Sequence, residues 1–272
     1  MYEINLQINW KGIIMAYTKE ILTLSVEIAD AMLRNGAEIY RIEETVIRIL
    51  KAYDIESFDV YVLSNGIFAS ANEDKEDACS MIRHVPLCSV NLGKITALNQ
   101  LARDICAHRV SLIDSWDRLD ECKKIPDYNK YLQYFFCGLG SAGFCFLFGG
   151  GILDSIFAFF IGYLEQIFLL RNSHNKMARF IKIIFASIMV SALSLIPSAI
   201  GLPVMRDKMV IGAIMPLVPG IAFTTAIREF YNGDYLSGSI HLIDALLTAV
   251  SIALGVCIPL GIAGYLGGGI FL

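Results

Sequence analysis

The sequence predicts an α+β domain in the first half of the chain and an all-α, polytopic membrane domain of about five transmembrane helices in the second. Charge is the first reason: of 48 charged residues, 35 precede Tyr131 and only 13 follow it. Hydropathy is the second, because long apolar segments fill the chain after that residue. Spacing is the third, since apolar residues in the first half change from a helical period to a period of two.

The first half is predicted to fold as an α+β domain over 18–130, after a poorly defined leader at 1–17. Helical periods, strand-like alternation and the hairpin dipeptide Asn65-Gly66 define its elements. In chain order these are helices over 18–35 and 39–53, a hairpin within 58–72, a short strand over 81–85 and one long amphipathic helix over about 92–122. Pro126 ends that helix. Helices beside a small antiparallel sheet make an α+β fold.

The second half, 131–272, is predicted to be the membrane domain. Five segments approach the roughly 20 residues needed to cross a bilayer: 131–148, 152–170, 180–200, 209–227 and 239–260. The loop after the second segment carries four basic residues and no acid, which marks the cytoplasmic side. The α+β domain would then be cytoplasmic too, in a multi-pass protein of the cell (plasma) membrane that contacts the lipid bilayer. Arg206 and Lys208, before the fourth segment, weigh against this orientation.

Composition argues against several kinds of protein. A net charge of −4 without a basic stripe argues against nucleic acid as a partner. The seven cysteines show no paired spacing, which suits a reducing compartment better than a disulfide framework. A zinc site is conceivable at Cys79, His84, Cys88, Cys106 and His108, but the spacing favours ordinary core residues. Neither a metal nor a cofactor is therefore predicted.

Residues 138–143, GLGSAG, match the pattern of a dinucleotide-binding loop letter for letter. That loop requires a strand before the glycines and a helix opening after them. Here the glycines fall inside an apolar segment, where small residues let membrane helices approach closely. Close helix packing is the favoured interpretation.

Polar residues recur along one face of two predicted membrane helices. Ser191 and Ser194 belong to a series spaced 4,3,4, and His241 and Asp244 begin one spaced 3,4,3,4. Helix packing explains serines well, whereas an ionisable group within a span usually faces a cavity or a partner. Asp244, and Glu165 in the second segment, are therefore candidate pathway residues and, with His241, candidate proton carriers. Both acids lie near cytoplasmic ends, so snorkelling to water is the alternative.

The fourth segment carries two prolines three residues apart, Pro216 and Pro219. Each removes a backbone donor, so a break near mid-membrane is expected. Transporters use such breaks to present carbonyls and helix ends to a substrate, although a kink that serves packing alone is the alternative. The candidate pathway residues that follow are Gly220, Thr224, Thr225 and Arg228. Arg228 could pair with Asp244 or Glu165, or attract a substrate carboxylate.

Four segments resemble the threonine/serine exporter family. They are NGAEIYRIEETVIRI (35–49), SNGIFAS (64–70), NLGKITALNQLAR (91–103) and MPLVPGIAFTTAIREFYNGDYLSG (215–238). The resemblance runs from about Thr18 to the end. It is closest to the branch in which a larger subunit, a cytoplasmic domain plus five spans, pairs with a separate, smaller membrane subunit. Fused members continue with a second multi-span half that this sequence lacks.

The resemblance also implies which residues form the family motifs. In the membrane domain these are Pro216, Pro219, Gly220, Thr224, Arg228, Gly233, Asp234, Ser237 and Gly238. In the cytoplasmic domain they are Gly36, Glu38, Arg41, Glu43, Asn65, Gly66, Asn91, Lys94 and Asn99.

Three functions compete. The favoured one is a subunit of a secondary transporter that exports small hydrophilic carboxylates, threonine and serine or succinate-like dicarboxylates, with a separate small multi-span membrane subunit; assembly into an oligomer is left open. The second is a membrane-tethered hydrolase using Glu38, Glu43 or Asn65, but the sequence shows no nucleophile–base pair, so an enzyme is not predicted. The third is a regulatory or scaffold subunit whose partner alone forms the pathway.

Overall fold

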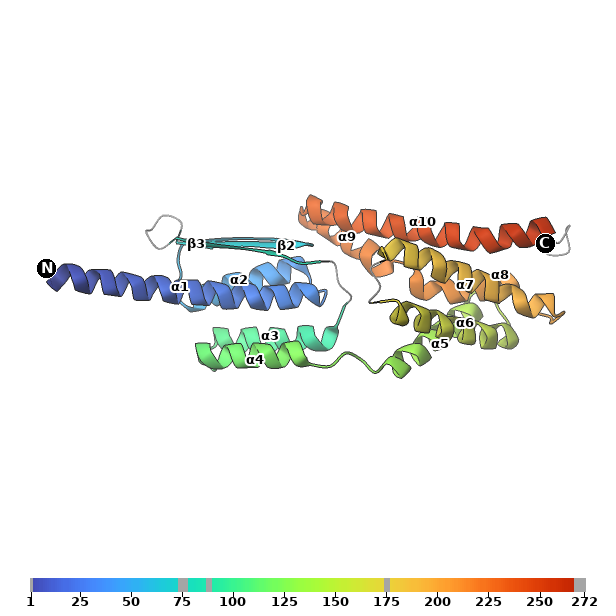
Figure 1. Cartoon of the computed structure of the whole chain (residues 1–272), viewed down its shortest axis with the longest axis horizontal. Coiled ribbons are helices and arrows are strands. Elements are labelled where there is room, and N and C mark those ends of the chain that lie inside the picture. Colours follow the sequence, from blue (N-terminus) through green and yellow to red (C-terminus); the bar gives the residue numbers. More distant parts are fainter. Residues whose placement is uncertain (1, 73–77, 87–89, 174–176, 267–272) are drawn as a thin grey trace. The chain divides into compact units, whose positions relative to one another are not determined.

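The computed structural model describes residues 2–72, 78–86, 90–173 and 177–266 of the 272-residue chain. It divides into two compact units, residues 1–127 and 128–272 (Figure 1). The described part of the first unit combines helices with one small sheet, and that of the second contains only helices.

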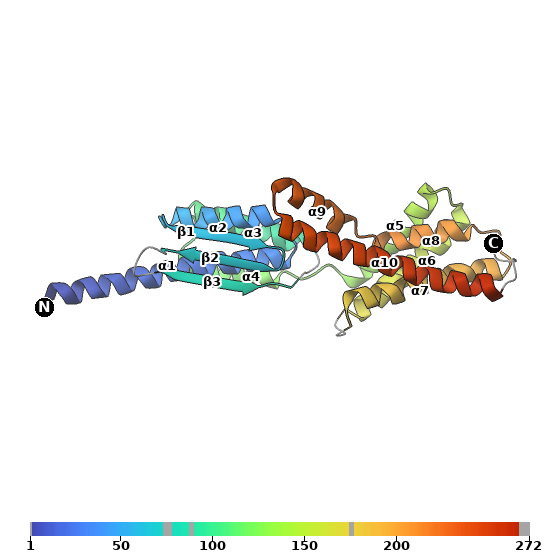
Figure 2. The same cartoon turned by 90° about the horizontal axis from the view of Figure 1, so that it is seen from above.

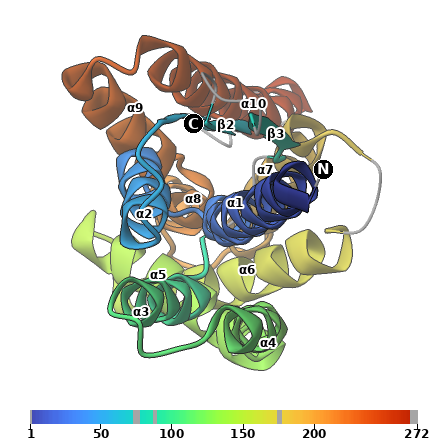
Figure 3. The ribbon, with the colours of Figure 1, turned by 90° about the vertical axis from the view of Figure 1, so that its left-hand side faces the viewer.

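The first unit has three layers. Its elements are α1 (Tyr2–Arg34), α2 (Ile39–Ala52), β1 (Phe58–Leu63), β2 (Gly66–Ala71), β3 (Cys79–His84), α3 (Leu92–Cys106) and α4 (Leu112–Lys124). The sheet packs on one side of α1 and α2, and α3 and α4 pack on the other (Figures 1 and 3). Because α1 is covered from both sides, apolar residues around most of its circumference are buried, among them Ile21, Leu22, Leu24 and Ile28.

The predicted hairpin is confirmed. β1 and β2 are antiparallel with Leu63 opposite Gly66, so the two residues Ser64 and Asn65 form the turn. β3 pairs antiparallel with the other edge of β2 and gives the sheet order β1-β2-β3. Val85, just after β3, donates its N–H to the carbonyl oxygen of Asn65 at 2.9 Å, which ties the turn to the third strand.

The single long helix predicted over 92–122 is wrong, because two helices, α3 and α4, occupy this stretch. α3 ends at Cys106, His108 takes a positive φ of 51°, and Ser111 caps α4 by accepting a hydrogen bond from the N–H of Asp114. The chain therefore reverses, and the two helices pack side by side (Figure 1). Both helices also pack against α1, so the apolar pattern continues across the turn. The spacing of apolar residues therefore does not reveal where one helix ends and the next begins.

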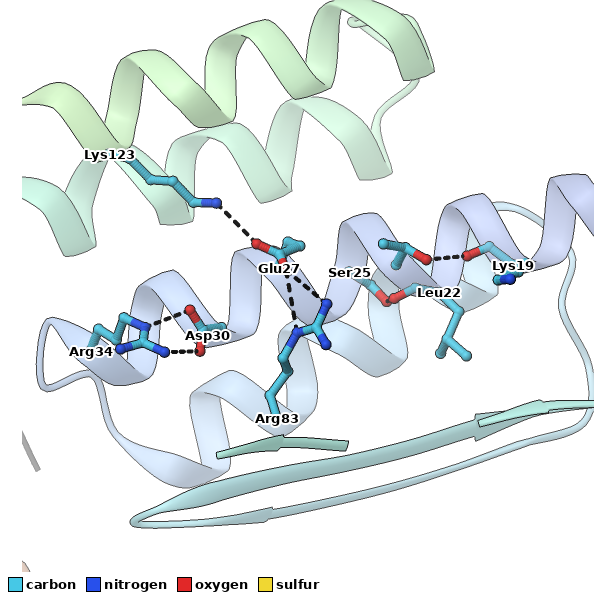
Figure 4. Close-up of polar contacts among 9 residues, drawn as sticks. Lys19, Leu22, Ser25, Glu27, Asp30, Arg34, Arg83 and Lys123 are labelled. Atoms are coloured by element: carbon cyan, nitrogen blue, oxygen red, sulfur yellow. Dashed lines mark hydrogen bonds and ion pairs between the residues drawn. The ribbon is translucent and has the colours of Figure 1, made fainter. Parts of the chain in front are cut away.

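Glu27 of α1 connects the three layers of the first unit. Its carboxylate accepts hydrogen bonds from Arg83 of β3 at 3.1 Å and from Lys123 of α4 at 3.0 Å (Figure 4). Burial alone would raise the pKa of Glu27, but the hydrogen bonds and positive charges of Lys123 and Arg83 outweigh burial, so the pKa is lowered. The ionised carboxylate therefore stabilises the folded unit.

We expect Glu27→Gln to lower the free energy of unfolding of the first unit by about 1 kcal/mol. Because the folded pKa is lowered, this contribution is present above the ordinary value of 4.5 and is lost as pH falls through the folded value. Hydrogen exchange of α4 in the full chain, in detergent at neutral and acidic pH, measures it. Glu44→Gln is the matched control, since the pair of Glu44 with Arg48 is exposed. Equal effects of both substitutions would contradict this account.

The second unit is a set of apolar helices. They are α5 (Lys130–Leu147), α6 (Ile152–Arg171), α7 (Arg179–Ala199), α8 (Arg206–Ile214), the 3-10 helix η1 (Met215–Leu217), α9 (Gly220–Asn232) and α10 (Tyr235–Leu266). Of the residues described, α6, α7 and α10 are long and apolar enough to cross a membrane, and α8–η1 with α9 makes up to a fourth crossing. α5 is not in that set, so the count of five spans stays a prediction. α10 extends beyond the predicted 239–260 at both ends.

The glycines of GLGSAG lie in α5, and Gly138 allows close packing, as predicted. A Cβ atom on Gly138 would lie 2.7 Å from the carbonyl oxygen of Phe159 in α6. On the α6 side, Gly162 has no room for a Cβ beside Ser141 of α5. The two helices, joined by a three-glycine turn in which Gly149 has a φ of +90°, therefore approach almost to backbone contact.

Gly212 allows α8 to pack as closely on α5. A Cβ there would lie 2.6 Å from Cys145 Cβ and 2.7 Å from the Cys145 backbone. We expect Gly212→Ala to destabilise the second unit by about 2 kcal/mol and to lower the midpoint of thermal unfolding in detergent. Gly143→Ala in α5 is the control, because a Cβ at that position meets nothing within 4 Å and alanine favours a helix. An unchanged midpoint for Gly212→Ala would show that this crossing is not tight.

Candidate functional site

The helix break predicted at Pro216 and Pro219 is present between α8 and α9. The two helical pieces on either side of it are bent by 53°. Pro216 lies in η1 and Pro219 immediately precedes α9, where the missing N–H and fixed φ of proline are tolerated. Gly220 donates its N–H to the carbonyl oxygen of Val218 at 2.8 Å, which closes the turn. The two prolines therefore account for the break between α8 and α9.

Gly220, Thr224 and Arg228 lie along one face of α9, because each follows the last by four residues. We call these three residues the α9 stripe, and all of them are exposed. The Thr224 hydroxyl donates to the carbonyl oxygen of Gly220 at 3.0 Å, while Thr225 beside it is half-buried. The α9 stripe is therefore a polar surface of this chain that starts at the break.

Glu229 and His241 meet where α9 reverses into α10. The reversal uses Gly233, whose φ is +89°, and Gly238, where a Cβ would lie 2.7 Å from Phe230. Glu229 is only 5% exposed, and its Oε1 lies 3.7 Å from His241 Nε2. The sequence prediction missed Glu229, although an acid within an apolar helix was a usable signal.

Asp244 connects α10 to the start of α7. Arg179 Nη1 lies 2.9 Å from Asp244 Oδ2, and about a quarter of the Asp244 side chain is exposed. The sequence had suggested Arg228 as a partner of Asp244, and the structure provides Arg179, the first residue of α7. The Asp244 side chain is therefore only partly covered by the described chain.

Glu165 is the most deeply buried acid among the described residues. Its side chain is 0% exposed, and neither carboxylate oxygen has a hydrogen-bond partner within the described chain. One turn earlier on α6, Ile161 packs against Val190 of α7 and Ala213 of α8, and Gly162 packs against α5. An ionised carboxylate without partners inside such a bundle is costly. In this arrangement the group therefore needs a proton or a bound cation.

Ser187 of α7 is a second buried polar group without a partner in the described bundle. α6 and α7 run in opposite directions (Figure 2). Glu165 and Ser187 therefore both lie about one helical turn from the Ile161–Val190 contact, displaced in the same direction. They are two of the buried polar groups inside this unit, and neither has a hydrogen-bond partner among the described residues.

Ser191 and Ser194 have contacts that serve helix packing. Both are fully buried; Ser191 Oγ donates to the carbonyl oxygen of Val256 in α10 at 3.2 Å, and Ser194 Oγ donates to that of Val190 at 2.8 Å. Gly255 completes the contact, since a Cβ there would lie 2.5 Å from Ser187 Cβ. α7 and α10 are therefore held together by small and hydroxyl-bearing residues.

Asp154 fixes the start of α8, a role that the sequence prediction missed. It is 3% exposed; Oδ2 accepts a hydrogen bond from the N–H of Gly151 at 2.7 Å, and Oδ1 accepts one from the N–H of Met205 at 2.9 Å. One carboxylate thus caps α6 and holds the residue before α8. The local capping pattern was visible in the sequence, but the second partner is distant along the chain.

Several predicted motif residues of the first unit have local structural roles. Glu38 precedes α2 and pairs with Arg41 at 3.1 Å, and Glu43 is half-buried on the same helix. Asn65 lies in the hairpin turn, and Gly66 is the first residue of β2.

Asn91 and Lys94 stabilise the start of α3. The Asn91 side chain caps the helix by accepting a hydrogen bond from the N–H of Lys94 at 3.1 Å and donates another to Asp127 at 3.0 Å. Lys94 Nζ also lies 3.1 Å from Asp127 Oδ1. Asn99, two turns further along, lines a groove between α2 and α3.

The described residues contain no group of three or more His, Cys, Asp and Glu side chains able to hold a metal ion. Of the five residues considered for zinc, Cys88 lies outside the part of the chain that the structure describes. Cys79 and Cys106 are half-buried cysteines of the first unit.

These features define a class of protein: a membrane protein with a small layered α+β unit and a helical unit in which a proline-rich break separates two apolar helices. The chain belongs to the threonine/serine exporter family, because residues 23–263 match the family described as "Putative threonine/serine exporter". The resemblance predicted from the motifs is thereby confirmed. The names of the family and of its relatives indicate a transporter and not an enzyme.

Three relatives show the range of the family. "Probable succinate transporter subunit YjjP" of Klebsiella aerogenes is 24% identical over 92% of this chain and 96% of its own length. The protein of that name in Escherichia coli is 22% identical over 92% of this chain and 97% of its own length. "Probable threonine/serine exporter" of Mycobacterium tuberculosis is 24% identical over 92% of this chain, but only 47% of its own length is covered. No solved structure matches.

Proposed function

We propose that this chain is one subunit of a secondary transporter that exports small hydrophilic carboxylates together with a separate small membrane subunit. The observation that carries the proposal is the match along 96% and 97% of two relatives that are themselves named transporter subunits. The relative named as a threonine/serine exporter is about twice as long as the matched region, which fits a second half supplied in that protein by the same chain. Threonine, serine and succinate-like dicarboxylates are the proposed substrates.

The substrate pathway is proposed to follow the break and the α9 stripe. Pro216 and Pro219 interrupt the helix beside Gly220, as in the interrupted helices of other transporters. Arg228, two turns along the same face, offers a guanidinium for a substrate carboxylate. The α9 stripe is exposed on this chain, which suits a pathway whose other wall belongs to the partner subunit.

Glu165 is proposed to couple transport to a proton or cation gradient. It is a buried acid with no hydrogen-bond partner in the described bundle, and ionising such a group is costly. Loss of its proton or bound cation should therefore accompany an opening of the surrounding helices. Asp244 and His241 are proposed as additional carriers nearer to water, with Glu229 beside His241.

The proposed topology has five crossings, with residues 18–130 as a cytoplasmic domain and 131–272 in the plasma membrane. Arg171, Arg179 and Lys182 flank the connection between α6 and α7, which supports a cytoplasmic location for this loop.

Co-expression tests the proposed function. Cells would carry this chain alone, a small membrane subunit alone, or both, and intracellular loss of threonine, serine and succinate would be followed with and without an uncoupler. We expect uncoupler-sensitive loss only when both are present. Full loss with the partner alone would instead make this chain a regulatory or scaffold subunit.

A further inference from the structure

A groove between α2 and α3 of the first unit plays no part in the proposed pathway. Its volume is about 480 Å³, within the range of small-molecule sites. Arg41 and Arg48 of α2 and Arg103 of α3 line it, against one lining carboxylate, that of Glu44. Both walls come from segments predicted as family motifs, 35–49 and 91–103, so the fold brings two distant motifs to one place.

Of the three arginines in the groove, Arg103 carries a charge that no described residue neutralises. Arg41 pairs with Glu38 and Arg48 with Glu44, both at exposed positions. Arg103 donates to Gln100 Oε1, a neutral oxygen, at 2.9 and 3.2 Å and forms no ion pair with any described residue. A guanidinium that binds only an amide keeps its charge available for an anion.

Neutral donors in the groove are also available to a ligand. Asn99 is half-buried and lines the groove, and its side-chain amide forms no hydrogen bond with the described residues. The Tyr40 hydroxyl accepts a hydrogen bond from Arg41 Nε at 3.0 Å, which leaves its own proton to donate. Charged and uncharged donors therefore meet on one surface.

An anion with two charged ends can bind Arg103 with one end and replace Glu38 or Glu44 at Arg41 or Arg48 with the other, because these exposed ion pairs are weak. Arg41 and Arg48 are seven residues apart on α2, which separates their backbone positions by about 10 Å along the axis. Compact phosphate sites usually form at helix N-termini, whereas this groove reaches the last turn of α3, at Arg103 and Cys106. We propose that the groove binds a small dicarboxylate, at a site separate from the transport pathway.

Calorimetric titration of the purified full chain in detergent with succinate, at constant ionic strength, tests the proposal. Inorganic phosphate is titrated in parallel, and hydrogen exchange locates the binding. We expect succinate to bind more tightly than phosphate and to slow exchange over 40–48 and 99–107. Arg103→Gln should weaken this binding at least about tenfold, and Asn99→Ala should weaken it less. Lys19→Gln removes one exposed positive charge outside the groove and should change nothing.

Three results would overturn the proposal: no slowing of exchange in the two segments, equal affinities of the Arg103→Gln and Lys19→Gln variants, or tighter binding of phosphate than of succinate. The proposed transport function is tested independently. Arg228→Ala should leave exchange protection of the groove intact, so loss of efflux and loss of groove binding are separable results.

Discussion

Glu165→Gln is expected to reduce efflux to the background of cells that lack this chain, while the protein remains folded in the membrane. Glutamine has nearly the same shape but cannot exchange a proton or neutralise a bound cation. Glu165 is fully buried, and neither carboxylate oxygen has a hydrogen-bond partner among the described residues. Efflux of succinate and threonine from co-expressing cells, divided by the amount of chain in the membrane, measures the effect.

Stability provides a second measurement for the same variant. Because the buried acid has no partner to lose, Glu165→Gln should leave the thermal midpoint unchanged or raise it. Asp207→Asn, at an acid whose side chain is 65% exposed in the same unit, is the matched control and should retain efflux. Wild-type efflux from Glu165→Gln would remove this residue from the mechanism, and a lower midpoint would indicate a structural role.

Arg228→Ala is expected to abolish efflux of the same substrates. Arg228 is the positive charge of the α9 stripe, two turns after the break, and a guanidinium holds a carboxylate through two hydrogen bonds. Arg228→Lys should retain part of the activity, because it keeps the charge but not the fork geometry. Initial efflux rates at several internal substrate concentrations would show whether substrate binding is weakened.

Arg171→Ala controls for the loss of one exposed positive charge from the second unit, and its efflux should match the wild type. If Arg171→Ala and Arg228→Ala reduced efflux equally, a general electrostatic effect would replace the specific role of Arg228. Wild-type efflux from Arg228→Ala would place the substrate elsewhere.

Local signals in the sequence predicted most elements of the fold. Asn65-Gly66 indicated the hairpin, and Pro216 with Pro219 indicated the break before α9. Gly36, whose φ is +77°, indicated the end of α1. Each depends on the conformations open to one or two residues, so neighbours in the chain suffice. The turn between α3 and α4 was not predicted, because its local signals, Ser111 and His108, are weak compared with the apolar pattern that continues through both helices.

The candidate site was only partly predictable because much of it depends on distant contacts. The partner of Asp244 is Arg179, and Asp154 reaches Met205, both pairs being far apart in the sequence. The burial of Glu165 follows from how four helices pack, which no local pattern contains. The joining of Arg41 and Arg103 in one groove is likewise a result of folding.

Uptake into liposomes tests the central claim most directly. This chain and a small membrane subunit would be reconstituted together, a pH gradient imposed, and the accumulation of labelled succinate and threonine measured. We expect gradient-driven accumulation that needs both proteins and is lost with Glu165→Gln. Equal accumulation without the gradient, or without this chain, would contradict it.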